Sequence, residues 1–217
     1  MNLSKACIFD LDGVIVDTVK AHFTAWKSIA EELDINFTEK ENELLKGVSR
    51  VESMQIILDL GGVSLPDKER EQLIERKNEL YVSIISSMTR EDILPGVLDS
   101  LALLKEQNIA CAIGSSSKNA SRILDAIDLS KEFDTIVDGN HLKNSKPDPE
   151  VFLLAAEKLG LNPHECTVIE DASSGVEAAK RGGMHCIAIG DEEVLKEADV
   201  IIPSMKEFSL SLLNQSA

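Results

Sequence analysis

Hydrophobic positions recur every three to four residues in one part of this 217-residue chain, between positions 17 and 91. Val19, Phe23, Trp26 and Ile29 form one such series. This spacing is typical of amphipathic helices, which bury a single face. The pattern predicts an all-helical unit, with helices near residues 19–33, 39–45, 50–60 and 67–87.

The rest of the chain alternates short apolar runs with amphipathic segments. The runs that predict buried strands lie at 6–9, 109–114, 135–137, 167–169, 186–189 and 200–202. The segments that predict helices lie at 119–127, 149–159 and 174–181. Such alternation indicates a parallel sheet with helices on both faces. We therefore predict an α/β fold with a doubly wound parallel-sheet core at residues 1–15 and 92–217. A helical cap domain at 16–91 is inserted after the first strand.

The composition indicates which cellular environment and which classes of partner to expect. The net charge of −16 disfavours nucleic acid and anionic membranes, and no run reaches the roughly 20 apolar residues of a membrane span. Asp10 interrupts the N-terminal apolar run too early for a signal peptide. The four cysteines show no metal-ligand spacing, which favours reduced core residues. We expect a monomer in the cytoplasm.

Charged or polar side chains stand near the ends of four predicted strands. They are Asp10, Asp12, Ser115, Lys146, Glu170 and Asp171. In a doubly wound sheet the carboxyl ends of the strands meet at one edge, which is where ligands bind. The carboxylates among them form a hard oxygen cluster that suits Mg²⁺.

This set of side chains predicts phosphoryl transfer. Asp10, at the end of its strand, is a candidate nucleophile that would form an aspartyl-phosphate. Asp12 could protonate the leaving oxygen and later deprotonate the acceptor. Ser115 and the N–H groups of the next helix could hold phosphate oxygens, and Lys146 would stabilise the charge of the transition state.

The same residues resemble the motifs of the haloacid dehalogenase superfamily of phosphotransferases. The resemblance rests on residues 10–13 (Asp-Leu-Asp-Gly), Ser115, Lys146-Pro147 and Glu170-Asp171, in this order, and spans the whole chain. It implies that the inserted helices are the small α-helical cap of that superfamily. A calcium loop beginning at Asp10 is disfavoured, because Ala21 stands where such a loop needs glutamate.

Sequences in the cap and in the core more closely resemble the β-phosphoglucomutase family. They are Asp17-Thr18, His22, Trp26, residues 45–50 (Leu-Lys-Gly-Val-Ser-Arg), Arg76-Lys77-Asn78, Tyr81 and residues 115–119. Members of that family interconvert β-glucose 1-phosphate and glucose 6-phosphate through a phosphorylated aspartate and β-glucose 1,6-bisphosphate.

The resemblance implies a role for each matching position. Mg²⁺ would bind Asp10, the backbone carbonyl of Asp12, Glu170 and Asp171. Ser115 and Lys146 would hold the transferring phosphoryl group, beside the backbone N–H of Ser116, where the best-known members have alanine. The other phosphate would contact Arg50, Ser117, Lys118 and Asn119. Thr18 and His22 would link cap closure to Asp12. The sugar would face Lys46, Gly47, Val48 and Lys77, and the cap sequence adds Trp26 and Ser49 as candidates.

Other interpretations stay open at this point. A sugar-phosphate phosphatase shares the core motifs but needs no second phosphate clamp. A non-catalytic sugar-phosphate-binding regulator would not require both aspartates. Trp26 could be a packing residue of the cap. Lys77 stands in a charged run and could belong to an exposed helix face.

Overall fold

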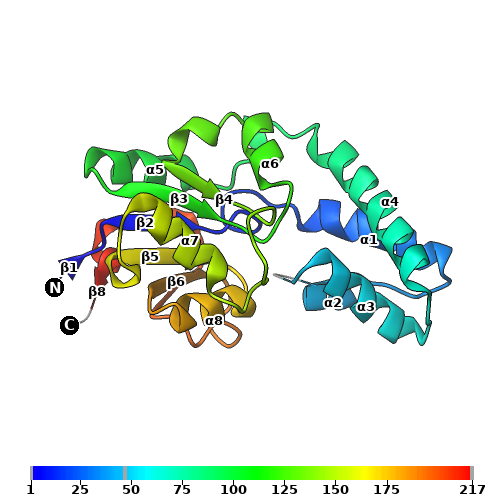
Figure 1. Ribbon diagram of the computed structural model, residues 1–217. Coiled ribbons are helices and arrows are strands. Elements are labelled where there is room, and N and C mark those ends of the chain that lie inside the picture. Colours follow the sequence, from blue (N-terminus) through cyan, green and yellow to red (C-terminus); the bar gives the residue numbers. More distant parts are fainter. Residues whose placement is uncertain (1, 46–47, 216–217) are drawn as a thin grey trace.

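A six-stranded parallel sheet forms the centre of the structure. The structure is a computed structural model that describes residues 2–45 and 48–215. The strands are β2 (Ala6–Phe9), β3 (Ala110–Gly114), β4 (Thr135–Val137), β5 (Cys166–Glu170), β6 (His185–Ile189) and β7 (Val200–Ile202). Their order is β4-β3-β2-β5-β6-β7, and each neighbouring pair is parallel. The predicted doubly wound sheet is therefore confirmed (Figure 1).

Helices cover both faces of this sheet because its strands are apolar on both sides. Phe9 packs in a cluster with residues of α5 (Val97–Glu106) and α6 (Ala120–Ala126). The adjacent Ile8 points to the opposite face, where it packs with residues of α7 (Glu150–Leu159) and α8 (Ser173–Arg181). Both neighbouring side chains are fully buried, as the continuous apolar run predicts.

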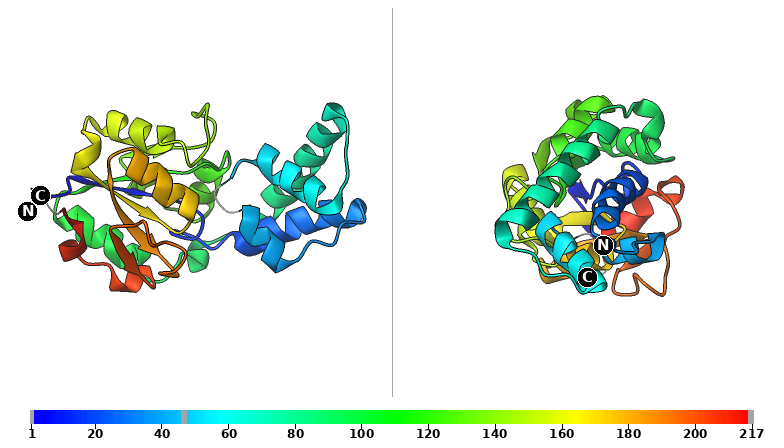
Figure 2. Two further views of the ribbon diagram at one scale, coloured as in Figure 1. Left: turned by 90° about the horizontal axis from the view of Figure 1, so that it is seen from below. Right: turned by 90° about the vertical axis from the view of Figure 1, so that its right-hand side faces the viewer.

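The segment between β2 and α5 forms a helical bundle beside the sheet (Figure 2). Its helices are α1 (Val19–Glu32), α2 (Glu39–Asn42), α3 (Arg50–Gly61) and α4 (Asp67–Ile85). The bundle has its own apolar cluster, which includes Trp26, Ile57 and Leu73. The predicted helices of this region are confirmed, and we call the bundle the cap.

Two chain segments join the cap to the sheet, and they run side by side. Val16 forms an isolated antiparallel bridge with Ile93, and the Leu94 backbone N–H donates to the carbonyl of Ile15 at 2.9 Å. The domain limits at residues 16 and 92 stay a prediction.

The sequence pattern missed α5 and a small antiparallel sheet of β1 (Asn2–Leu3) and β8 (Asn214–Gln215), which pairs the first and last described segments of the chain (Figure 1). Short 3₁₀ turns complete the structure at Glu43–Leu45, Arg90–Asp92, Ser130–Glu132, Pro163–Glu165, Met205–Glu207 and Leu210–Leu213. All four cysteines are buried and unpaired, as expected. Within the described residues, no helix has both the length and the hydropathy that a membrane span requires.

Candidate active site

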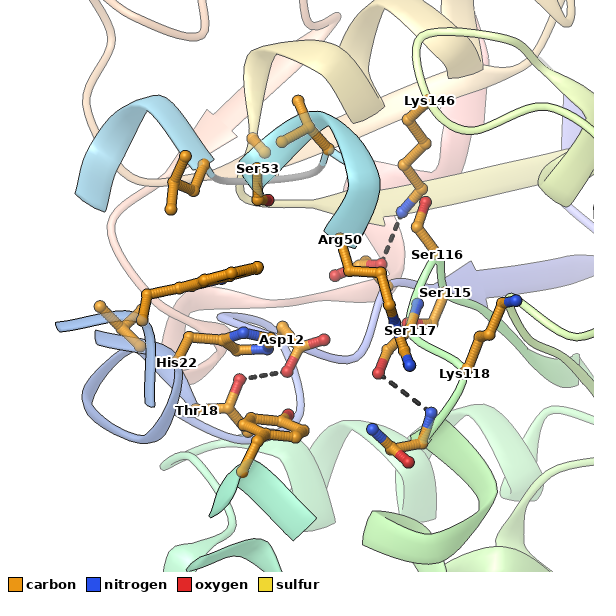
Figure 3. Close-up of a pocket in the computed structure, with 18 of the residues that line it drawn as sticks. Asp12, Thr18, His22, Arg50, Ser53, Ser115, Ser116, Ser117, Lys118 and Lys146 are labelled. Atoms are coloured by element: carbon orange, nitrogen blue, oxygen red, sulfur yellow. Dashed lines mark hydrogen bonds and ion pairs between the residues drawn. The ribbon is translucent and has the colours of Figure 1, made fainter. Parts of the chain in front are cut away.

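A cavity lies where the carboxyl edge of the sheet meets the cap (Figure 3). It contains about 1010 Å³ of empty space, including its opening to solvent. The cap contributes Thr18, His22 and Arg50 to one side, and the core contributes Ser115 and Lys146 to the other. The predicted site residues that line the cavity are Asp10, Asp12, Thr18, His22, Trp26, Val48, Arg50, Lys77, Ser115, Ser116, Ser117, Lys118, Asn119, Lys146, Glu170 and Asp171.

Lys146 lies between two buried carboxylates. Its Nζ donates to Asp10 Oδ1 at 2.5 Å and to Glu170 Oε1 at 2.7 Å. Burial alone would lower the pKa of Lys146, but the two carboxylates outweigh it and raise that pKa above its ordinary value. Burial raises the pKa of Asp10 to about 7, against the opposing effect of Lys146. The ammonium therefore keeps its charge next to the candidate nucleophile.

Three carboxylates at this edge form a group that could hold a metal ion. Asp10, Glu170 and Asp171 each offer an oxygen within 4.8 Å of the others. The Glu170 carboxylate is also held by the backbone N–H groups of Asp171 and Ala172, at 2.7 and 2.8 Å. Hard oxygen ligands of this kind suit a divalent cation such as Mg²⁺.

Two glycines leave the space that these carboxylates occupy. A Cβ at Gly175, in α8, would lie 1.7 Å from Glu170 Oε1. A Cβ at Gly13 would lie 2.0 Å from Asp171 Oδ2, and Gly13 has a φ of +85°, which L side chains rarely adopt. The close approach of backbone to carboxylate explains why both positions are glycine.

Asp12 is held by the cap rather than by the group of three carboxylates. The Thr18 hydroxyl donates to Asp12 Oδ1 and does not cap α1, although Thr18 occupies the N-cap position. Burial raises the pKa of Asp12, and the Thr18 hydrogen bond opposes this effect. A carboxyl group that is separate from the metal-suited side chains and faces the cavity can exchange a proton with a ligand.

The loop of residues 115–119 follows β3, and the hydroxyl groups of its own serines hold its backbone in place. Ser115 Oγ accepts a hydrogen bond from the backbone N–H of Ser117 at 3.1 Å. Ser117 Oγ in turn accepts from the backbone N–H of Asn119 at 3.2 Å. The Asn119 amide donates to Asn78 Oδ1 of the cap at 3.1 Å, which joins the two sides of the cavity.

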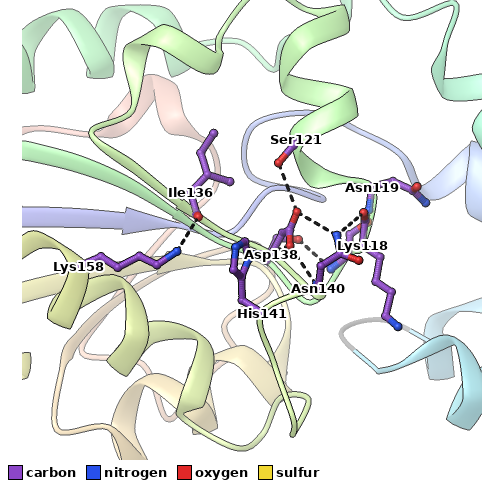
Figure 4. A network of polar contacts seen from close by, with 10 residues as sticks. Lys118, Asn119, Ser121, Ile136, Asp138, Asn140, His141 and Lys158 are labelled. Atoms are coloured by element: carbon purple, nitrogen blue, oxygen red, sulfur yellow. Dashed lines mark hydrogen bonds and ion pairs between the residues drawn. The ribbon is translucent and has the colours of Figure 1, made fainter.

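A polar network behind this loop fixes its backbone (Figure 4). The Gly139 N–H donates to the Ser117 carbonyl at 3.1 Å, and Asn140 Nδ2 donates to the Lys118 carbonyl at 3.0 Å. The buried Asp138 carboxylate accepts from the Asn140 N–H at 2.9 Å. The sequence analysis missed this network, although it too follows a strand, β4, at the carboxyl edge.

Lys77 points inward from α4 and is 5% exposed, so the exposed-face interpretation of this residue is wrong. Its Nζ lies 3.0 Å from His22 Nδ1 and 4.8 Å from the centre of the Trp26 ring. Burial lowers the pKa of Lys77 to about 7, assisted by Arg50. Burial and both cations lower the pKa of His22 well below its ordinary value, so this imidazole is neutral. Trp26 both packs in the cap cluster and lines the cavity.

Some expected residues are not placed in the cavity. Ser49 is not among its lining residues; its hydroxyl accepts from the Glu52 N–H at 3.3 Å and caps α3. Lys46 and Gly47 lie outside the described residues. The lining residues missing from the predicted set are Val19, Asn42, Leu45, Ser53, Asn78, Tyr81 and Ala172. Ser53 could have been found, because it precedes the buried Ile57 by one helical turn.

Comparison with known proteins agrees with this geometry. The sequence model of the haloacid dehalogenase-like hydrolase family matches residues 7–189. The chain is 44% identical, over 97% of its length and 94% of the relative, to β-phosphoglucomutase of Bacillus subtilis (strain 168). It is 34% identical to a phosphorylated carbohydrates phosphatase of Thermotoga maritima, over 97% and 99% of the two chains. The crystal structure of a β-phosphoglucomutase from Clostridium difficile superposes with a TM-score of 0.92 at 41% identity, covering 96% of this chain and 95% of that one. The chain therefore belongs to the haloacid dehalogenase-like hydrolase family.

Proposed function

We propose that this protein is a Mg²⁺-dependent β-phosphoglucomutase. It interconverts β-D-glucose 1-phosphate and D-glucose 6-phosphate through an aspartyl-phosphate on Asp10 and bound β-glucose 1,6-bisphosphate. The observation that carries the proposal is a cavity with two cationic regions. Lys146 stands beside the nucleophile, and Arg50 of the cap lines the same cavity as Lys118 of the core. The relatives named β-phosphoglucomutase support the same activity.

The phosphoryl transfer follows from the placement of the two aspartates. An oxygen of Asp10 attacks phosphorus, while Asp12 gives its proton to the departing sugar oxygen. In the next half-reaction Asp12 removes the proton of a sugar hydroxyl, which attacks the aspartyl-phosphate. Lys146 and Ser115 hold the oxygens of the phosphoryl group in transit. A Mg²⁺ ion bound by Asp10, Glu170, Asp171 and the Asp12 carbonyl would neutralise part of the phosphoryl charge.

A mutase must bind a bisphosphate in two orientations, so it needs a second phosphate site. Arg50 and Lys118 can supply this site, since a guanidinium grips phosphate oxygens with two hydrogen bonds. Ser117 and Asn119 stand in the same loop as Lys118 and line the cavity. The non-transferring phosphate would therefore bridge cap and core.

The cap has a second role in this proposal, which is to exclude water from the aspartyl-phosphate. Residues 16–91 would move as one unit about the paired segments near Val16 and Ile93. The Thr18 contact with Asp12 forms between the start of the cap and the core. Closure would therefore exclude water while the Thr18 contact holds the proton-transferring group in place.

A sugar-phosphate phosphatase is the second candidate, and the 34% identity to the T. maritima phosphatase favours it. It would use the same Asp10 chemistry with water as the acceptor. A non-catalytic sugar-phosphate-binding regulator is disfavoured because Asp10, Asp12 and Lys146 all occupy the cavity. Small sugar phosphates are the only ligands in this proposal. That the protein is a cytoplasmic monomer without nucleic-acid or membrane partners stays a prediction.

Phosphorus NMR separates the two catalytic candidates. The protein is incubated with Mg²⁺, β-glucose 1-phosphate and a trace of β-glucose 1,6-bisphosphate. Glucose 6-phosphate is the product expected of a mutase, whereas inorganic phosphate as the main product would identify a phosphatase. The α-anomer serves as the control for stereospecificity, and omission of Mg²⁺ should stop turnover.

Arg50→Ala tests the second phosphate site. We expect mutase turnover to fall about 10- to 100-fold, because a hydrogen-bonded charge pair with the distal phosphate is lost. Hydrolysis of acetyl phosphate, which has no distal phosphate, should change little. Arg76→Ala is the matched control, since Arg76 is an arginine of the cap that pairs with Glu32 and does not line this cavity. Equal losses in both reactions would make Arg50 a structural residue.

Gly175→Ala tests the arrangement of the metal-suited carboxylates. Alanine favours a helix over glycine, but its Cβ would displace the Glu170 carboxylate. We expect the apparent affinity for Mg²⁺, measured by titration of activity, to fall about 10- to 100-fold. Gly182→Ala, at the end of the same helix, is the control because the nearest atom that its Cβ would meet beyond its chain neighbours is the Ala178 carbonyl oxygen at 3.3 Å, not a carboxylate. An unchanged Mg²⁺ titration for Gly175→Ala would contradict this view of Glu170.

A further inference from the structure

Three buried polar atoms without a hydrogen-bond partner belong to residues that line the cavity. Among the described residues, Asn42 Oδ1 and Tyr81 Oη of the cap and Ser116 Oγ of the core lack a partner, and all three residues line the cavity. A buried carbonyl oxygen without a donor destabilises a fold, so such atoms are few and each calls for an explanation. The three atoms therefore indicate groups that a ligand completes.

Asn42 is the most informative of the three, because its Oδ1 can only accept a hydrogen bond, whereas the hydroxyl groups of Tyr81 and Ser116 can both donate and accept. It is the last residue of α2 and is 5% exposed, whereas Glu39 and Lys40 of the same helix are exposed. On the cap side of the cavity it shares the lining with Trp26 and Leu45, which are also buried. An apolar side chain at position 42 would suit the packing of the cap, so the amide needs another reason.

The chemistry of the oxygen selects the kind of ligand atom. A carbonyl oxygen only accepts hydrogen bonds, so its partner must bring a proton. Phosphate oxygens are anionic at neutral pH and would be repelled by it. A sugar hydroxyl donates, and a sugar also presents the apolar C–H faces that fit beside Trp26 and Leu45.

We propose that Asn42 is a specificity-determining residue whose Oδ1 accepts a hydrogen bond from one ring hydroxyl of the bound hexose phosphate. This inference rests on the proposed function and goes beyond it, because it assigns recognition of the sugar ring to α2. A site built around a buried acceptor rejects analogues that lack the matching hydroxyl, since the acceptor would stay unpaired. Discrimination between hexose phosphates would then depend on this residue.

The experiment pairs variants with substrate analogues. Asn42→Leu removes the acceptor and keeps the branched shape and the number of side-chain heavy atoms, and Asn42→Ala removes it with a smaller side chain. For each, kcat/KM is measured with β-glucose 1-phosphate and with its 2-deoxy, 3-deoxy and 4-deoxy analogues. We expect both variants to lose about 10- to 100-fold with the parent substrate. For one analogue, wild type and variants should give the same kcat/KM, which identifies the hydroxyl.

Two controls separate recognition from cap packing. Phosphorylation of the protein by acetyl phosphate contains no sugar and should be unchanged in both variants. Ile57→Val, a fully buried substitution in the cap that does not line the cavity, should affect all four substrates alike. Equal losses of the Asn42 variants on every substrate, or no loss, would overturn the proposal. A wild-type protein that does not isomerise β-glucose 1-phosphate would instead contradict the proposed function.

Discussion

Asp10→Asn is expected to abolish phosphoenzyme formation and to reduce mutase turnover by at least about 10⁴-fold. An amide is a poor nucleophile towards phosphorus. Among the described residues, Glu170 is the one other carboxylate that forms an ion pair with Lys146. Glu170 differs from Asp10 because Lys146 engages one of its oxygens and two backbone N–H groups hold the other. Asparagine nearly preserves the volume of the side chain, so the loss would report chemistry rather than packing.

Intact-protein mass spectrometry after incubation with acetyl phosphate measures the phosphoenzyme, and a coupled assay measures glucose 6-phosphate. Asp17→Asn is the matched control: Asp17 is an exposed aspartate close in sequence that accepts from the Val19 N–H and does not line the cavity. It should retain both activities. Turnover of Asp10→Asn near the wild-type rate would remove Asp10 from the nucleophile role.

The sheet could be predicted because buried parallel strands leave a strong sequence signal. The apolar run at Ala6–Phe9 matches β2 at both ends. Helix α5 was missed although Val97, Leu101 and Leu104 have helical spacing, because the apolar residues that lie between them obscure the period. Strands β1 and β8 have two residues each, too few to show any alternation.

The core side of the candidate site was predictable for a topological reason. Parallel strands end at one edge, so polar residues after β2, β3 and β5 must converge whatever their separation in sequence. Tertiary packing decides finer features, such as the network of Asp138 and Asn140 behind the loop of residues 115–119. No local pattern says which polar side chains will meet across two strands.

The cap side of the site was harder to predict because the charged residues of its helices lie in two environments, the exposed surface and the buried interior. Arg76 and Lys77 are neighbours in one charged run, yet Arg76 pairs with Glu32 at the surface while Lys77 is buried. The spacing of the sequence contains this difference between the two cations. Lys77 lies four residues, or one helical turn, from Leu73 and from Tyr81, which are both buried. A lysine at a buried position of such a helix indicates that this face of the helix lines a ligand site.

Asp12→Ala is expected to slow phosphoryl transfer between protein and sugar by roughly 10²- to 10⁴-fold, the usual range for a general acid–base group. Phosphorylation of Asp10 by acetyl phosphate should be much less affected, because acetate leaves without needing a proton. The variant should therefore accumulate phosphoenzyme and fail to pass it to glucose 6-phosphate, which rapid-quench kinetics can resolve.

Thr18→Val separates the proton-transfer role of Asp12 from its placement. It removes the hydroxyl that holds Asp12 Oδ1 and leaves the carboxyl group in the cavity. A mispositioned acid–base group still functions, so we expect a smaller loss, about 10-fold, confined to the step that involves the sugar.

If Asp12→Ala transferred the phosphoryl group at the wild-type rate, another group would have to move the proton. If Asp12→Ala instead lost phosphorylation by acetyl phosphate as severely as transfer to sugar, Asp12 would act mainly through the carboxylates beside Lys146 and not as an acid–base group.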